Sequence, residues 1–320
     1  MLRAILIYLS QAGWARRIVT GWSFARRSAA RFVAGETCEE AIKAIKQLNE
    51  LGINGTVDHL GEHTTSDEGA HQATGDIKEI FDAIEQSGVR ANVSIKLTQI
   101  GLALDRELCA RNLEAILTHA RGYNNFVRLD MEDSPWVDAT LELYWRMRKQ
   151  KGFDNVGVVF QAYLYRCKND QDAVIAENGR VRLCKGAYIE PPNIAYPSKR
   201  DVDENFDSLA CSLLEAAGAP GAPKLSADGK WPPIPAIATH DVKRIEYARR
   251  CMEKFKLPKD AMEFQMLYGI RRDLQKQLIQ DGYRVRVYVP FGTEWYPFFV
   301  RRLAERPANL WFLISNLFRG

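Results

Sequence analysis

Eight strand-like segments that alternate with helical segments predict that this 320-residue chain folds as a (βα)8 barrel of the α/β class. The alternation extends over about 250 residues, which is the usual length of such a barrel. A doubly wound open sheet is the alternative that the same alternation allows. The expected strands lie at residues 54–60, 91–97, 126–131, 156–163, 181–185, 234–240, 262–267 and 284–289.

Helical periodicity occupies the intervals between these strands. A helix is expected to begin at Thr37 and to end at Gly52, ahead of the first strand. Residues 218–230 (GAPGAPKLSADGK) are expected to form a surface loop and not a phosphate-binding turn, because no strand precedes them and no helix follows. Further helices are expected at residues 107–119, 136–149, 204–217, 241–255 and 273–280.

The N-terminal segment has a different character from the rest of the chain. Residues 1–35 contain no acidic residue and carry six arginines among large aromatic side chains, which predicts a basic amphipathic helical arm. The chain is therefore divided into an arm, residues 1–36, and a barrel domain, residues 37–320. Composition leaves three roles open for the arm: a transit peptide, a helix on an anionic membrane surface, or a helix packed on the barrel.

The composition of the whole chain narrows the class of protein. A hydrophobic fraction of 46% is sufficient for one large core, and a formal charge of +4 is too small and too scattered to favour nucleic acid as a partner. The six cysteines are widely spaced and form no CxxC motif, so a reducing, cytoplasmic compartment is expected, with peripheral contact at the inner face of the membrane left open. No apolar run reaches the roughly 18 residues of a membrane span.

The alternation within the expected strands predicts a polar barrel interior. One parity is apolar, for example Val93, Val127 and Val285, and is assigned to the outside. Buried charges without partners each cost several kcal/mol, so inward-pointing polar groups must pair with one another or with a bound molecule. Most of them lie near the carboxyl ends of the strands, where barrel enzymes have their sites. The inward polar residues are Ser94, Lys96, Thr98, Arg128, Asp130, Arg182, His240, Gln265, Arg286 and Tyr288.

A charged stripe follows the last strand. Phe298, Arg301, Arg302 and Glu305 recur at helical spacing before Pro307 ends the helix. This pattern fits either a solvated helix face with an Arg301–Glu305 pair or a clamp in which two guanidiniums bind a carboxylate and Glu305 receives a cationic nitrogen. The stripe alone fits both interpretations, and the other segments of the sequence are needed to distinguish them.

Several other residues have both a functional and an ordinary structural interpretation. Lys96 could extend along the surface, but its parity points inward. Asp130 is free for the interior if Asp133 or Ser134 caps the next helix, and Gly186 after Arg182 would let a ligand approach the backbone. His59 and His63 with Glu62 have the spacing of metal ligands but follow a strand in a glycine-rich loop, so no metal site is predicted. No GxSxG or GxGxxG motif is present.

Several ordered segments resemble one enzyme family. VSIKLTQIG, RLDMEDS, VFQAYLYR, RLCKGAYIEP, ATHD, EFQMLYGIRRDLQKQL and YRVRVYVPFG with FVRRLAERPAN are similar to the bacterial monofunctional proline dehydrogenases, flavin enzymes on a distorted (βα)8 barrel. The resemblance covers residues 54–309, and its most specific parts are KGAY and the Arg-Arg-x-x-Glu helix. It implies oxidation of L-proline to 1-pyrroline-5-carboxylate, the first step of its degradation to glutamate, with hydride transfer to FAD and electrons passed to a membrane quinone.

The resemblance also implies roles for individual residues. Lys96, Arg301 and Arg302 would hold the proline carboxylate, and Glu305 would lie beside the ring nitrogen. Tyr188, Leu267 and Tyr288 would form the ring pocket. Arg182 would face the flavin and, with Asp130, act in catalysis. The further FAD contacts implied are Met131, Gln161, Lys185, Gly186, Ala187, Thr239 and His240. The family commonly has tyrosine at the position of Phe298, so a hydroxyl is missing near the clamp and substrate affinity is expected to differ.

Two other classes of protein remain open from the residues alone. A barrel enzyme that acts on a carboxylate without flavin would share the clamp and would be colourless. A basic interaction module would need only the arm, and its binding to anionic lipid or nucleic acid would weaken strongly with salt.

Overall fold

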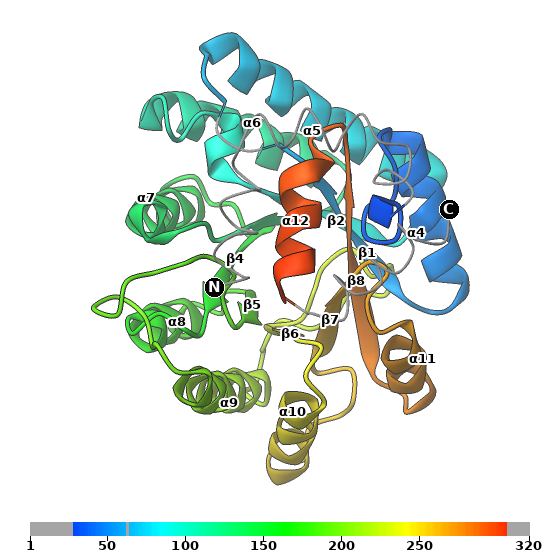
Figure 1. The fold of residues 1–320 in the computed structure, drawn as a ribbon, viewed down its shortest axis with the longest axis vertical. Coiled ribbons are helices and arrows are strands. Elements are labelled where there is room, and N and C mark those ends of the chain that lie inside the picture. The colour runs from blue at the N-terminus through cyan, green and yellow to red at the C-terminus, as the bar shows by residue number, and fades with distance from the viewer. Residues whose placement is uncertain (1–27, 62–63, 306–320) are drawn as a thin grey trace, which may run out of the picture.

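The computed structural model describes residues 28–61 and 64–305, with only the backbone for residues 303–305. Eight parallel strands form a closed barrel in sequential order, surrounded by helices (Figure 1). The strands are β1 (Asn54–His59), β2 (Ala91–Ile95), β3 (Val127–Leu129), β4 (Val156–Gln161), β5 (Val181–Cys184), β6 (Pro235–Ala238), β7 (Glu263–Leu267) and β8 (Arg284–Phe291). The helices are α4 (Cys38–Glu50), α5 (Asp67–Ser87), α6 (Arg106–Gly122), α7 (Ser134–Trp145), α8 (Cys167–Ala176), α9 (Lys199–Ala217), α10 (Val242–Lys254), α11 (Arg272–Gln280) and α12 (Trp295–Glu305).

Barrel closure excludes the open-sheet alternative. β8 pairs with β1 in parallel from Asn54↔Arg286 to His59↔Phe291, so the last strand completes the ring with the first. Every strand expected from the sequence is present, with ends that differ by a few residues. The predicted (βα)8 barrel is confirmed.

Local capping explains where several helices begin. Thr37 accepts a hydrogen bond from the Glu40 amide while the Glu40 side chain reaches back, a capping box that contributes about 1 kcal/mol. Ser198 caps α9 in the same way, through the Asp201 amide, so this helix begins five residues before the expected position 204. The predicted loop at 218–230 is confirmed, because no helix or strand occurs there.

One expectation at the start of α7 is wrong. Asp133 precedes α7 but its side chain makes no capping bond. Glu190 supplies the cap instead, since its carboxylate accepts from the Ser134 amide at 2.7 Å and from the Ser134 hydroxyl at 2.6 Å. The expected helix 136–149 is present: α7 continues directly into a π-helical turn, Arg146–Gln150, so only the hydrogen-bond pattern of the last turn differs from an α-helix.

The outer and inner faces of the strands differ as predicted. Val93, Val127 and Val285 are buried in the apolar core between strands and helices. The barrel interior is polar, and at its lower end Arg286 and Glu263 form a salt bridge of 2.8 Å between completely buried side chains. Met131 shares the sequence parity of the outward Val127, but it follows the end of β3 and lines the interior cavity, in agreement with the FAD contact that the resemblance implies.

Helix α12 crosses the middle of the view down the barrel, while the other labelled helices surround it (Figure 1). Its apolar face packs against a short N-terminal segment, since Ala29, Phe32 and Val33 form one buried cluster with Trp295 and Phe299. Backbone bonds join the same segment to β8, from the Ala34 amide to the Pro290 carbonyl at 2.8 Å. The N-terminal segment therefore helps to position the helix that carries the predicted clamp.

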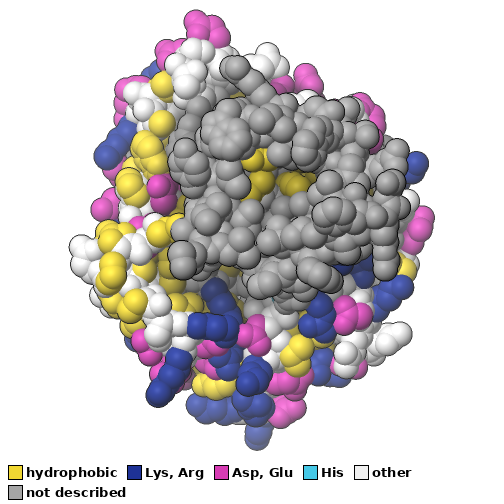
Figure 2. Space-filling view, viewed as in Figure 1, with side chains coloured by type: hydrophobic (Ala, Val, Ile, Leu, Met, Phe, Trp, Pro, Cys, Tyr) yellow, Lys and Arg dark blue, Asp and Glu magenta, His cyan; other side chains and the backbone are white. Residues whose placement is uncertain are grey.

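Most of the predicted arm, residues 1–27, lies outside the described residues, and the proposed boundary at residue 36 remains a prediction. Among residues 28–61 and 64–305, no helix is both long enough and apolar enough to span a bilayer. On the face shown in Figure 2, lysine and arginine side chains gather along the lower edge over α9 and α10, with carboxylates among them. Pairs such as Arg200–Glu204 and Arg249–Asp281 balance these charges.

Candidate active site

A cavity of about 470 Å³ lies at the carboxyl ends of the strands, below α12. It contains the side chains that the sequence assigned to substrate and cofactor, with Glu305 outside the described side chains. The predicted residues that line it are Lys96, Asp130, Met131, Gln161, Arg182, Lys185, Gly186, Ala187, Tyr188, Thr239, His240, Leu267, Tyr288, Arg301 and Arg302. Because these residues come from strands far apart in the sequence, only a closed barrel brings them together.

Asp130 is the centre of a hydrogen-bonded cluster. Its Oδ1 accepts from Ser94 Oγ and from Arg182 Nη1, each at 2.6 Å, and its Oδ2 accepts from the Tyr288 hydroxyl at 2.7 Å. The Arg182 guanidinium also lies 5.2 Å from the centre of the Tyr288 ring. Burial and the neighbouring carboxylates hold the pKa of Tyr288 well above its ordinary value, so the phenol remains a hydrogen-bond donor. These contacts leave Asp130 no capping role in α7.

Arg182 is fixed from a second direction by Gln265. The Gln265 amide oxygen accepts from Arg182 Nε, while its amide nitrogen donates to Glu263. Glu263 in turn accepts from Arg286 Nε at 2.8 Å, and Arg286 donates to the Gly55 carbonyl at 2.7 Å. A continuous polar network therefore connects the bottom of the barrel to the cavity and compensates the charges of Arg182 and Arg286. Arg128 lies outside this network and donates to the Val158 and Arg180 carbonyls.

Lys96 lies immediately after β2 and is 7% exposed. Its ammonium donates to both carboxylate oxygens of Asp58, at 3.0 and 3.2 Å. Asp58 comes from β1, is completely buried, and lines the same cavity. The prediction that Lys96 points inward is confirmed, whereas its carboxylate partner was not identified from the sequence.

The charged stripe of α12 faces the cavity. Arg301, Arg302 and Phe298 all line it, and the Arg302 guanidinium lies 4.9 Å from the centre of the Phe298 ring. Arg302 is 7% exposed, which excludes a solvated face for this residue. At the position where the family commonly has tyrosine, the ring of Phe298 thus supports a guanidinium through a cation–π contact, which needs no hydroxyl.

Lys185 is held by two carboxylates at the edge of the cavity. Its ammonium contacts Asp203 of α9 and Asp241, the residue that caps α10, at 2.5 and 2.9 Å. Burial works to raise the pKa of both aspartates, but the hydrogen bond from Lys185 and the nearby lysine charges outweigh burial and lower each pKa. The sequence did not identify these partners, although Asp203 immediately precedes one predicted helix (204–217) and Asp241 is the first residue of another (241–255).

The structure gives a reason for glycine at position 186 in addition to the expected close approach of a ligand. Its φ is +116°, and an added Cβ would lie 2.2 Å from the Tyr163 ring, so packing alone requires glycine here. Close approach of a ligand to this backbone remains a prediction.

Gln161 and His240 are oriented by backbone groups. Gln161 donates from Nε2 to the Glu132 carbonyl at 2.8 Å, and His240 Nε2 accepts from the Leu267 amide at 3.0 Å. When His240 is neutral, its proton is therefore on Nδ1. The Thr239 hydroxyl accepts from the Asp241 amide at 3.1 Å and so fixes the turn that follows β6.

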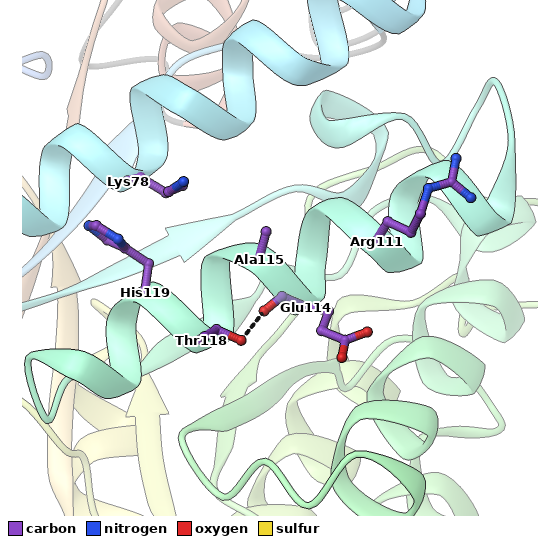
Figure 3. Close-up of a pocket in the computed structure, with 6 residues that line it drawn as sticks. All are labelled: Lys78, Arg111, Glu114, Ala115, Thr118 and His119. Atoms are coloured by element: carbon purple, nitrogen blue, oxygen red, sulfur yellow. Dashed lines mark hydrogen bonds between the residues drawn. The ribbon is translucent and has the colours of Figure 1, made fainter.

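A second hollow, of about 450 Å³, lies outside the barrel between α5 and α6 (Figure 3). Two of its ionisable side chains already have partners, since Glu114 pairs with Lys151 at 2.9 Å and His119 with Asp82 at 2.7 Å. In the described residues, no group of three or more His, Cys, Asp or Glu side chains could hold a metal ion. Of the histidine motif at the end of β1, Glu62 and His63 lie outside the described residues.

The fold and the cavity define a (βα)8-barrel protein with a charged ligand site at the carboxyl ends of its strands. The chain matches the family model described as proline dehydrogenase over residues 41–314. It is 40% identical to proline dehydrogenase 1 of Bacillus subtilis strain 168 over 319 residues, which cover 100% of both chains. It is also 40% identical to proline dehydrogenase of Deinococcus radiodurans over 295 residues, covering 91% of this chain and 90% of that one.

A solved structure of a related protein also matches the fold of this chain. Proline utilization A from Bdellovibrio bacteriovorus, inactivated by N-propargylglycine, matches with a TM-score of 0.79 and 27% identity, over 88% of this chain and 33% of that one. The chain belongs to the proline dehydrogenase family, whose members are flavin-dependent oxidoreductases. The resemblance stated from the sequence is confirmed.

Proposed function

We propose that this protein oxidises L-proline to 1-pyrroline-5-carboxylate, with FAD as hydride acceptor. The observation that carries the proposal is the single cavity in which Lys96, Arg301 and Arg302 accompany Arg182 and Asp130. Three cations suit one substrate carboxylate, and guanidinium forks bind carboxylates with defined geometry. The reaction would be the first step of proline degradation to glutamate.

In this proposal the substrate is oriented by both of its ends. Lys96, Arg301 and Arg302 bind the carboxylate, while Tyr188, Leu267 and Tyr288 enclose the ring. Glu305 would receive the ring nitrogen before its proton leaves. Fixing the substrate in one orientation raises the effective molarity of the reacting carbon and accounts for much of the rate enhancement expected from such a site.

The chemistry of the cavity fits a flavin. Arg182 would face it as a fixed cation, held by Asp130, Ser94 and Gln265, and would stabilise negative charge. When bound, FAD would supply the hydride acceptor. The residues that would hold it are Met131, Gln161, Lys185, Gly186, Ala187, Thr239 and His240.

The electron acceptor that follows FAD is proposed to be a membrane quinone. The basic arm supports this, because a cationic amphipathic segment is attracted to an anionic membrane surface. The protein would then work on the cytoplasmic side, with peripheral contact at the inner face of the membrane.

The purified protein is expected to be yellow and to hold FAD without a covalent bond. The sequence contains no motif that indicates flavin attachment, and of the cysteine and histidine side chains that line the cavity, Cys184 and His240, the histidine already accepts a hydrogen bond at Nε2 from the Leu267 amide. Acid precipitation should therefore release the colour into the supernatant, and an absorption spectrum of both fractions measures it. A colourless protein that still acts on a carboxylate substrate would favour a flavin-free barrel enzyme, and colour retained in the pellet would contradict non-covalent binding.

The value of kcat/KM for proline is expected to rise with pH from neutral, by up to about tenfold per pH unit. Hydride loss from carbon needs the nitrogen lone pair, and free proline carries a protonated amine. The raised pKa of Tyr288 keeps its phenol neutral across this range, so loss of the Tyr288–Asp130 bond should not produce a falling limb. Steady-state rates on the FAD-loaded enzyme test this, and a flat profile would count against transfer from the neutral amine.

A further inference from the structure

Asp58 is a buried carboxylate of the cavity to which neither the sequence nor the family resemblance gave a role. We propose that Asp58 is a positioning residue for substrate binding: the fixed counter-ion that keeps Lys96 protonated and aimed at the substrate carboxylate. The inference rests on the proposed function, because it assigns Lys96 to that carboxylate.

The geometry of the pair supports a fixed role. Lys96 Nζ lies within hydrogen-bond distance of both Asp58 oxygens, at 3.0 and 3.2 Å, and the two side chains are 8% and 1% exposed. The register of β1 with β2 places Asp58 opposite Ser94, two residues before Lys96. Asp58 in β1 and Lys96 at the end of the adjacent β2 therefore both reach into one cavity.

Burial makes the two charges depend on each other. Burial lowers the pKa of a lysine and raises that of an aspartate, because both charged forms lose water, and a nearby opposite charge offsets the loss. Burial is the largest influence on Asp58 and keeps the pKa of this carboxyl above its ordinary value, while the charge of Lys96 is the main influence that lowers the pKa. Without the Asp58 charge, Lys96 should lose its proton at a lower pH, and binding of a substrate carboxylate would then require proton uptake.

Other groups around Lys96 do not titrate in the same way. Asp130, which follows β3, is hydrogen-bonded to Tyr288 of β8, and Tyr288 also interacts with Asp58. Arg182 of β5 and Arg301 and Arg302 of α12 keep their charge over this pH range. His240, which follows β6, is unchanged in each variant. A pH dependence that appears only when Asp58 is neutralised is therefore attributable to Lys96.

The test uses tetrahydro-2-furoate, a ring carboxylate in which oxygen replaces the proline nitrogen, so the probe has no amine to titrate or oxidise. Calorimetry on the FAD-loaded protein would give Kd from about pH 6.5 to about pH 8.5, the range in which a destabilised buried lysine titrates. Wild type should change by less than about threefold across this range. Asp58→Asn should bind about as well as wild type at the lower pH and lose about tenfold or more by the higher pH.

Lys96→Met is the matched control and should bind weakly at every pH, with no added effect of Asp58→Asn in the double variant. A Kd for Asp58→Asn that equals wild type, or differs by one constant factor at all pH values, would overturn the Asp58 inference alone. If wild type does not bind the probe at all, the proposed substrate site fails as well.

A second measurement covers the case in which Asp58→Asn does not fold. Lys96→Met leaves a buried carboxylate uncompensated, so the double variant Asp58→Asn/Lys96→Met should have a higher Tm than Lys96→Met. A double variant that is no more stable than Lys96→Met would show that the two charges are not interdependent, and the inference would be rejected.

Discussion

Replacement of Arg302 by lysine is expected to lower kcat/KM for proline by about tenfold or more, a loss of about 1.4 kcal/mol or more in transition-state stabilisation. A lysine ammonium is a point charge and cannot reproduce the planar fork that binds both oxygens of a carboxylate. The lysine side chain is also shorter, so the cation–π contact that the Arg302 guanidinium makes with the Phe298 ring, at 4.9 Å, would be lost. KM should therefore rise, and steady-state kinetics on FAD-loaded protein measure both parameters.

Arg301→Lys and Lys96→Met are expected to act in the same direction, because their side chains line the same cavity. Arg200→Lys is the matched control: Arg200 belongs to the exposed surface of α9, with its side chain 83% exposed and paired with Glu204. It should leave the kinetics unchanged. Near-normal kinetics in all three clamp variants, with FAD retained, would mean that the stripe on α12 does not bind substrate.

The barrel could be predicted from the sequence because its determinants are local. Strand parity and helical period are set by neighbouring residues, and the valines of β2, β3 and β8 identify the outer face without knowledge of the partners. Lys96, Asp130 and Arg182 could be assigned to the interior for the same reason. The polar parity also extends through β1, where Thr56 and Asp58 alternate with Val57, and attention to this strand would have found Asp58.

The pairs that complete the site could not be predicted, because they depend on distances in three dimensions. Asp203 and Asp241 belong to different helices and meet at Lys185 only when α9 and α10 pack together. Glu190 caps α7 from a loop distant in the sequence, whereas local sequence reasoning had favoured the adjacent Asp133 as the capping residue. The requirement for glycine at 186 likewise comes from the Tyr163 ring, more than twenty positions earlier in the chain.

Tyr288 lines the cavity and, in the proposed site, would form a rigid wall of the substrate pocket. Its hydroxyl is bound to Asp130 at 2.7 Å and its ring lies beside the Arg182 guanidinium, so the side chain cannot turn aside without losing both contacts. A hydroxyl on the substrate ring would meet this aromatic surface or lose its water without gaining a partner. The site should therefore prefer proline to trans-4-hydroxyproline.

Tyr288→Ser is expected to lower kcat/KM for proline by about tenfold or more and to reduce the preference for proline over trans-4-hydroxyproline severalfold. Serine removes the wall, frees space for the additional oxygen and supplies a small hydroxyl, and Asp130 loses the hydrogen bond from the tyrosine hydroxyl.

Tyr288→Phe is the matched control, because it loses the same bond to Asp130 but keeps the ring. It should lower activity and leave the preference unchanged. The measurement is the ratio of kcat/KM for the two substrates with each variant loaded with FAD. A ratio that Tyr288→Ser leaves at the wild-type value, with both activities lowered alike, would mean that Tyr288 supports the flavin site and does not contact the substrate ring.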